Sequence, residues 1–105
     1  MKTAHECQHL NEVWEAIDRI DHDIIALIAR RATYVELAAD FKKDEKAVRD
    51  KARVEQVIAS KRTLAERYRV SPDLVERLYR TMIDFFVAAE MVRWNDVEKP
   101  RGRSN

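Results

Sequence analysis

Glycine, proline and cysteine are all scarce in this chain. Its 105 residues include one glycine, two prolines and one cysteine. Hairpin turns and sheet corners depend on glycine and proline, so the composition argues against a β-rich fold. The abundant Ala, Leu, Ile, Glu, Lys and Arg favour an all-α fold. The single cysteine, Cys7, cannot form an internal disulfide, which agrees with a reducing compartment.

The sequence also lacks long apolar runs and any large excess of one charge. No segment approaches the roughly 18 uninterrupted apolar residues of a membrane span, and the N-terminal MKTAHECQHL has no apolar signal-peptide core. We therefore expect a cytoplasmic protein that does not bind a membrane. The formal net charge is +1, with both signs interspersed, which argues against a nucleic-acid partner.

The apolar pattern predicts three helices. The first runs from about Leu10 to about Lys43, because its apolar residues recur at alternating steps of three and four. The second ends near Arg69, and the third begins after Ser71, a good N-cap that is followed by proline. We predict a single domain over residues 1–98 and a disordered tail over 99–105. The residues that mark the first seam are Leu10, Val13, Ile17, Ile20, Ile24 and Leu27.

The length of the first helix indicates a partner chain. About 34 residues of helix measure roughly 50 Å, whereas a compact domain of this size has a radius of gyration near 13 Å. Residues 10–41 contain neither glycine nor proline that would break the helix. An interlocked all-α homodimer, in which two long helices cover each other's seams, is therefore the simplest arrangement.

Arg31 occupies a position in the apolar seam where a leucine would be expected. A buried arginine needs an anionic partner, because an unpaired charge removed from water costs several kcal/mol. No acidic residue stands at the adjacent seam positions. We therefore interpret Arg31 as a group that binds an anionic ligand. The alternative is an arginine whose stem packs while its charged end reaches water.

Glu90 is a second charged residue within an apolar row, in the third helix. Burial favours the protonated form of a carboxyl group, which can donate a hydrogen bond as glutamine does. Alternatively, Glu90 pairs with Arg93 or Arg31 and only holds helices together. Lys42 lies roughly 16 Å beyond Arg31 along a straight helix, so one ligand reaches both only if the helix bends or Lys42 lies in a loop.

Three segments carry a resemblance to a known family: EAIDRIDHDIIALIARRATYVELAADFK, AVRDKARVEQVI and the late AAEMVRW. They resemble the AroQ class of chorismate mutases, and more closely the isochorismate pyruvate lyases of salicylate and siderophore biosynthesis. The likeness covers about residues 1–95. It implies an intertwined helical homodimer with two equivalent active sites, without a metal or a cofactor, which binds an enol-pyruvyl dicarboxylate such as isochorismate or chorismate.

The resemblance also assigns roles to individual residues. Arg31 matches the arginine that clamps a substrate carboxylate, and Lys42 matches a loop lysine that contacts the ether oxygen and a carboxylate. Glu90 stands where the lyases usually have a glutamine and some mutases have a glutamate that is active when protonated. Val54 replaces the glutamate with which true mutases bind the C4 hydroxyl of chorismate, which favours the lyase. The implied pocket walls are Val35, Ala38, Val57, Phe86 and Val87.

Trp14 departs from the family pattern. The family has an arginine at this position, contributed across the dimer by the other subunit, and an indole cannot make a bidentate contact to a carboxylate. Three interpretations remain open: a variant lyase, a protein whose ligand has one carboxylate, or a site that no longer catalyses. Trp14 is alternatively an ordinary core or interface aromatic.

The sequence thus predicts an isochorismate pyruvate lyase with weak chorismate mutase activity. The alternative is a non-catalytic helical dimer that binds a related aromatic acid or acts as an interaction module. No metal site is expected, because Cys7 would point away from His5 and His9 on a helix. The arginines outside the seam, Arg62 among them, are interpreted as solvated.

Overall fold

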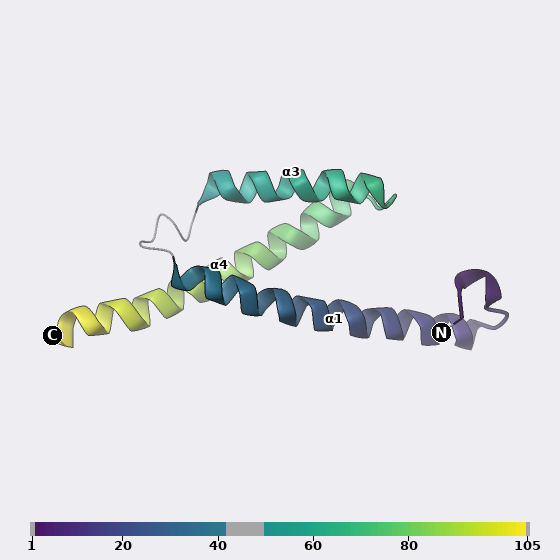
Figure 1. Cartoon of the computed structure of the whole chain (residues 1–105), viewed down its shortest axis with the longest axis horizontal. Helices are drawn as coiled ribbons and strands as arrows, with labels where there is room; N and C mark the ends of the chain where they lie inside the picture. Colours follow the sequence, from purple (N-terminus) through teal and green to yellow (C-terminus); the bar gives the residue numbers. More distant parts are fainter. Residues whose placement is uncertain (1, 42–49, 105) are drawn as a thin grey trace. The chain divides into compact units, whose positions relative to one another are not determined.

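The computed structural model describes residues 2–41 and 50–104, with side chains described as far as Val92. A short 3₁₀ helix η1 (Ala4–Glu6) precedes the α-helices α1 (Leu10–Asp40), α3 (Lys51–Arg67) and α4 (Pro72–Ser104) (Figure 1). The described residues contain no strand, which confirms the all-α prediction. Among these helices, none is long and apolar enough to cross a membrane.

The helix starts follow local capping chemistry. α1 begins at Leu10, as the apolar seam predicts, and its assigned end is Asp40 instead of Lys43. α3 begins at Lys51 because the carboxylate of Asp50 accepts a hydrogen bond from the backbone N of Arg53 at 3.0 Å. This cap places the start of α3 one turn earlier than its apolar residues alone would indicate.

A tight turn joins α3 to α4. The backbone N of Val70 donates to the carbonyl of Ala65 at 2.9 Å, and the backbone N of Arg69 donates to Glu66 at 3.1 Å. These two bonds form a Schellman motif, whose left-handed residue is usually glycine. Here it is Arg69, with a φ of 58°. The turn therefore ends α3 close to the predicted position, with a residue that is strained in this conformation.

α4 starts as the sequence predicts. The hydroxyl of Ser71 accepts a hydrogen bond from the backbone N of Leu74 at 3.3 Å, and Pro72 takes the first helical position. The helix continues to Ser104, and the disorder expected for residues 99–105 stays a prediction. Extension of an existing helix costs less than nucleation of a new one, which explains why polar residues continue α4.

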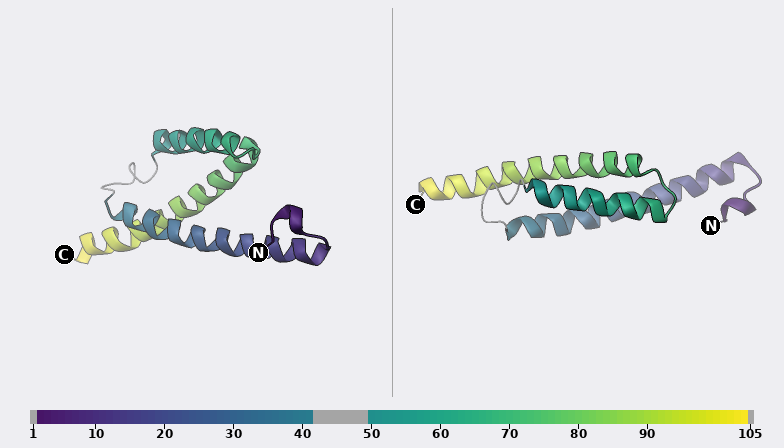
Figure 2. Two further views of the ribbon diagram at one scale, coloured as in Figure 1. Left: turned by 45° about the vertical axis from the view of Figure 1, so that its right-hand side comes forward. Right: turned by 90° about the horizontal axis from the view of Figure 1, so that it is seen from above.

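The contacts group the chain into two compact units, Met1–Val35 and Glu36–Asn105, and the boundary between them falls within α1. The sequence predicted one domain without such a boundary, and that stays a prediction. In the second unit, α3 and α4 form an antiparallel hairpin (Figure 2). Its buried residues include Ile58 and Ala65 of α3 and Met91 of α4.

α1 contrasts with this hairpin, because none of its residues is buried. Its apolar side chains are exposed along the whole helix: Ile25 is 67% exposed and Tyr34 is 68% exposed. Monomeric soluble proteins rarely expose so many large apolar side chains along one helix, and such exposure is typical of interaction surfaces.

Candidate functional site

Arg31 lies in the last third of α1. Its side chain is half-buried, and the Nη1 atom of the guanidinium is shielded from solvent. The apolar neighbours on the seam, Leu27 and Tyr34, are 55% and 68% exposed. In most proteins leucine is buried and arginine is exposed, so the relative exposure of these seam residues is the reverse of the usual pattern. Arg31 thus presents a cation beside an apolar surface, where attraction for a carboxylate is stronger than in open water.

Trp14 lies near the other end of α1 and is 53% exposed. Seventeen residues of helix separate it from Arg31, which corresponds to about 25 Å along a straight axis. One small ligand cannot contact both residues of the same copy. If both contact one ligand, as the resemblance implies for this pair of positions, they must come from two different copies of the chain.

The α3–α4 hairpin carries a second group of predicted site residues. Val57 on α3 and both Phe86 and Val87 on α4 are half-buried. The Phe86 ring meets Phe85 edge to face, with ring centroids 5.7 Å apart. Glu90 is 8% exposed and lies next to the buried Met91. The burial of Glu90 that its apolar row predicts is therefore confirmed.

The predicted site residues divide between the two units. Trp14, Arg31 and Val35 belong to the first unit, where Val35 is half-buried. Ala38 is exposed and belongs to the second unit with the hairpin residues. Lys42 lies outside the described residues, so its predicted contact with the ether oxygen stays a prediction.

Charged residues along one side of the hairpin form a network that the sequence analysis missed. We call it the hairpin network; its members are Glu55, Arg62, Asp73, Glu76 and Arg80. The Nη2 atom of Arg80 donates to both carboxylate oxygens of Glu55, at 2.9 and 2.8 Å. Its Nε atom donates to Glu76 at 2.7 Å. The network therefore connects α3 to α4 away from the turn.

Arg62 extends the same network toward the turn. Its Nη1 atom donates to Glu76 at 2.8 Å and to Asp73 at 3.0 Å. The interpretation of Arg62 as a solvated arginine was therefore wrong. The i, i+4 spacing of Glu76 and Arg80 could have predicted their ion pair from the sequence. The pairs between α3 and α4 could not be predicted, because they depend on how the two helices pack.

The network changes the acidity of its central carboxylate. The hydrogen bond from Arg80 lowers the pKa of Glu76, and the bond from Arg62 acts in the same direction. Desolvation opposes both effects without overcoming them. The ionised form of Glu76 is thus the form that the folded hairpin prefers.

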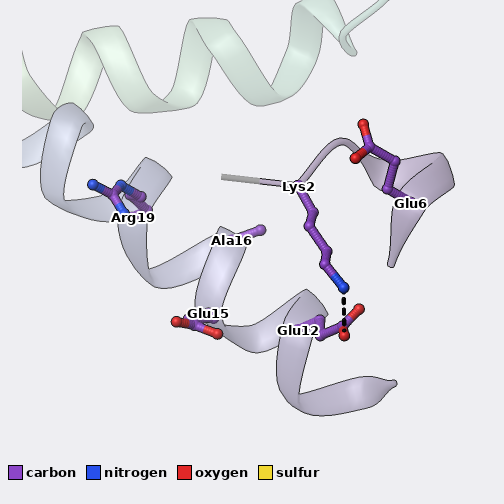
Figure 3. A pocket seen from close by; sticks show the side chains of 6 residues that line it. All are labelled: Lys2, Glu6, Glu12, Glu15, Ala16 and Arg19. Carbon is purple, nitrogen blue, oxygen red and sulfur yellow. Dashed lines mark hydrogen bonds and ion pairs between the residues drawn. The ribbon is translucent and has the colours of Figure 1, made fainter. Parts of the chain in front are cut away.

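A polar cavity lies between the N-terminal segment and the first turns of α1 (Figure 3). It measures about 570 Å³, and Lys2 closes one side by an ion pair with Glu12 at 2.9 Å. Glu12 also accepts a hydrogen bond from the backbone N of Gln8 at 2.8 Å. The contact with Lys2 is the main cause that lowers the pKa of Glu12. The other residues around the cavity are Glu6, Glu15, Ala16 and Arg19.

The His5, Cys7 and His9 string lies in this N-terminal segment. Cys7 is half-buried, and its Sγ atom donates to the carbonyl of Thr3 at 3.4 Å. The described part of the chain contains no group of three or more His, Cys, Asp or Glu side chains that could hold a metal ion. The string therefore forms no ligand group there.

Comparison with known proteins places these residues in a family. The family model described as chorismate mutase type II matches residues 13–91. An isochorismate pyruvate lyase from Pseudomonas aeruginosa is 35% identical over 94 residues, which cover 90% of this chain and 93% of that protein. The match includes α3, all of α1 except its first turn, and α4 as far as the buried Glu90 and Met91. The chain belongs to the type II chorismate mutase family.

Proposed function

We propose that this protein is an isochorismate pyruvate lyase that forms salicylate and pyruvate, with weak chorismate mutase activity. The observation that carries the proposal is the 35% identity to a protein named isochorismate pyruvate lyase, over nine tenths of the chain. A reaction of this kind belongs to salicylate and siderophore biosynthesis in the cytoplasm. The proposal needs no cofactor.

Val54 supports the lyase over the mutase. It lies in the first turn of α3 and is half-buried. Its isopropyl side chain cannot accept or donate a hydrogen bond, so it cannot bind the chorismate hydroxyl that a glutamate holds in true mutases. A site that lacks this contact binds chorismate less tightly and loses little with isochorismate, whose hydroxyl is attached elsewhere on the ring.

Arg31 would bind one carboxylate of the substrate. A planar guanidinium can make two parallel hydrogen bonds to a carboxylate, which fixes both its position and its orientation. The apolar side chains of Val35, Ala38, Val57, Phe86 and Val87 would contact the ring. Substrate orientation matters here, because a reaction within one molecule is accelerated when the reacting atoms are held close together.

Lys42 and Glu90 would stabilise the charge that develops on the ether oxygen. The hydrogen on C2 moves to the pyruvyl methylene carbon while the ether C–O bond breaks. The electrons of that C–H bond complete the aromatic ring of salicylate, and the enol-pyruvyl group leaves as pyruvate. A cationic lysine and a protonated Glu90 would both donate to the ether oxygen, which is more negative in the transition state than in the substrate.

The proposal includes a homodimer. α1 has 31 residues, none of which is buried, and its apolar seam is exposed. Each large apolar side chain that becomes fully buried contributes about 1.5–3 kcal/mol, so a partner helix would stabilise α1 substantially. A second copy has a seam of the same length and spacing, and two copies can cover each other symmetrically.

Trp14 favours a second candidate function. Its exposed indole stands where the family has an arginine, so the site has one carboxylate clamp fewer. A flat aromatic surface suits a ring with one carboxylate, and salicylate is a ligand of that kind. The second candidate is therefore a non-catalytic helical dimer that binds an aromatic monocarboxylate.

Direct assays separate these functions. The purified chain is incubated with isochorismate or with chorismate, while salicylate fluorescence and chorismate absorbance are recorded. Salicylate formation from isochorismate supports the lyase. Salicylate binding in a calorimeter, without turnover of either substrate, supports the binding protein and contradicts the lyase.

The variant Glu90→Gln tests the role of the Glu90 proton. If this proton is donated to the ether oxygen, only the protonated carboxyl group of Glu90 supports the reaction. Glutamine donates a hydrogen bond at every pH, so we expect a flatter profile of kcat against pH for Glu90→Gln. Identical profiles for the two proteins would contradict the role.

A further inference from the structure

We propose that the hairpin network fixes the rotation of α4 about its own axis and so sets the direction in which Glu90 points. Arg80 is in this view a positioning residue, since it acts through the helix and not on the substrate. The consequence for catalysis rests on the proposed function, whereas the control of rotation does not.

Apolar packing alone specifies the rotation of α4 poorly. On the side toward α3 the helix carries half-buried apolar residues such as Val75, Met82 and Ile83. On the outer side Leu78 is 54% exposed and Phe85 is 71% exposed. The hydrophobic effect is non-directional, so either side of α4 could cover α3 with a similar gain. Another kind of contact must distinguish the two sides.

The hairpin network provides that contact. Glu55 is on α3, and both oxygens of its carboxylate lie within 2.9 Å of the Arg80 guanidinium. Glu76 accepts one hydrogen bond from Arg80 on its own helix and another from Arg62 on α3. Hydrogen bonds therefore connect α3 to α4 at two positions along the helices. Hydrogen bonds to charged groups require defined distances and directions, unlike apolar contacts. A rotation of α4 would break the bonds that cross between the helices, from Arg80 to Glu55 and from Arg62 to Glu76.

Glu90 lies on the same seam of α4 as the network. The steps from Glu76 to Arg80, Val87 and Glu90 are four, seven and three residues, which keeps their side chains on one side of the helix. An α-helix turns by about 100° per residue and is stiff over the roughly 15 Å between Arg80 and Glu90. A rotation by one residue at Arg80 would therefore replace Glu90 with Ala89 or Met91.

Exposed ion pairs add little net stability, so this network serves mainly to exclude alternative arrangements. The Arg80 side chain is 40% exposed and that of Glu55 is 61% exposed. Removal of the Arg80 charge should therefore leave a folded hairpin whose α4 samples more than one rotation. This outcome differs from general destabilisation, which would affect every position of the helix alike.

Thiol labelling measures the rotation directly. In a Cys7→Ser background, single cysteines are placed by Ile83→Cys on the half-buried side and by Asp84→Cys on the exposed side. We expect the cysteine at 84 to react at least about tenfold faster than that at 83, because reaction requires access to the thiolate. Arg80→Met should reduce this ratio at least about threefold, while Arg80→Lys gives an intermediate ratio.

The control variant is Arg77→Met, which removes an exposed arginine from the outer side of the same helix. It should leave the ratio unchanged. An unchanged ratio in Arg80→Met, or an equal acceleration at both cysteines, would overturn the inference. Both results are independent of enzyme activity, so they stand even if the wild-type chain has no lyase activity and the proposed function fails.

If the wild-type chain does form salicylate, a second measurement tests the consequence for Glu90. Arg80→Met should lower kcat at least about fivefold with a smaller change in KM, because a group that acts in the transition state is misdirected. Arg77→Met should retain the wild-type kcat. A wild-type kcat in Arg80→Met, despite a reduced labelling ratio, would overturn the link between the network and Glu90.

Discussion

α1 and the α3–α4 hairpin are organised in opposite ways. The hairpin has side-chain caps at the start of both helices, buried Ile58 and Ala65, and ion pairs between its helices. α1 has no buried residue, and the hydroxyl of Thr33 donates to the carbonyl of Ala29 within the same helix. The hairpin is therefore stabilised within one chain, whereas the apolar surface of α1 is available to a partner.

The comparison also separates two kinds of charged residue. In the hairpin, Arg62 and Arg80 contact carboxylates of the same chain, and their pKa values are raised by those hydrogen bonds. On α1, Arg31 is half-buried among exposed apolar residues. The hairpin arginines are thus structural, whereas the anion-binding role of Arg31 belongs to the proposed function. The predictions below test this division.

The largest effect is expected from a charge on the α1 seam. Ile24→Asp places a carboxylate where two copies would meet, and the burial of an unpaired charge costs several kcal/mol. We expect a monomeric chain with reduced helicity, measured by sedimentation and circular dichroism. Ala29→Asp adds the same charge outside the seam and should remain dimeric. A dimeric Ile24→Asp would show that α1 is not the interface.

Arg31→Ala should abolish ligand binding with little loss of stability. Two charge-assisted hydrogen bonds would be removed, so we expect kcat/KM for isochorismate to fall about 100-fold or more, the equivalent of roughly 2.7 kcal/mol. Arg30→Ala, at the neighbouring exposed arginine, is the matched control and should keep its activity. Unfolding of Arg31→Ala with unchanged affinity would instead support a structural role for Arg31.

Trp14→Arg should raise activity. In the proposed dimer Trp14 of one copy approaches the Arg31 site of the other, so the new guanidinium would add a second carboxylate clamp. We expect kcat/KM for isochorismate to rise at least about tenfold, or roughly 1.4 kcal/mol of transition-state binding. Mixed dimers, in which Trp14→Arg and Arg31→Ala are on different copies, would test action across the interface. A variant that dimerises without any gain would favour the binding protein.

Acid should weaken the hairpin through Glu76. Because its pKa is lowered in the folded chain from the ordinary 4.5, its stabilisation is complete above that value. It is lost as the pH falls through the lower folded pKa, since the unfolded chain then binds more protons. Thermal unfolding followed between pH 6 and 3 should show a steeper decline in Tm for the wild type than for Glu76→Gln. Parallel declines would exclude Glu76 as the cause.

The smallest effect concerns the turn. Arg69 has a φ of 58°, a conformation that costs a non-glycine residue roughly 1 kcal/mol. Arg69→Gly should therefore stabilise the hairpin by about 0.5 kcal/mol, after the greater flexibility of glycine in the unfolded chain is taken into account. Arg67→Gly, at the last residue of α3, should instead destabilise it, by less than the roughly 1 kcal/mol of a helix interior. Denaturant unfolding of both variants measures the difference.

Much of the architecture was readable from local patterns. The start of α1 at Leu10 and the Ser71 cap of α4 depend on residues within a few positions of each other, and both were predicted. Burial of Glu90 was also readable, because its neighbours along the helix are apolar.

Contacts between helices were beyond the reach of the sequence. Periodicity shows which side of a helix is apolar, but not which residue of another helix lies opposite it. The bond from Arg62 to Glu76 and the cavity beside Lys2 depend on how segments fold back in three dimensions. The sequence by itself determined the helices, the apolar seam with Arg31, and the family. Only the tertiary structure decided the partners of the charged residues, because hydrogen bonds need an approach within about 3 Å.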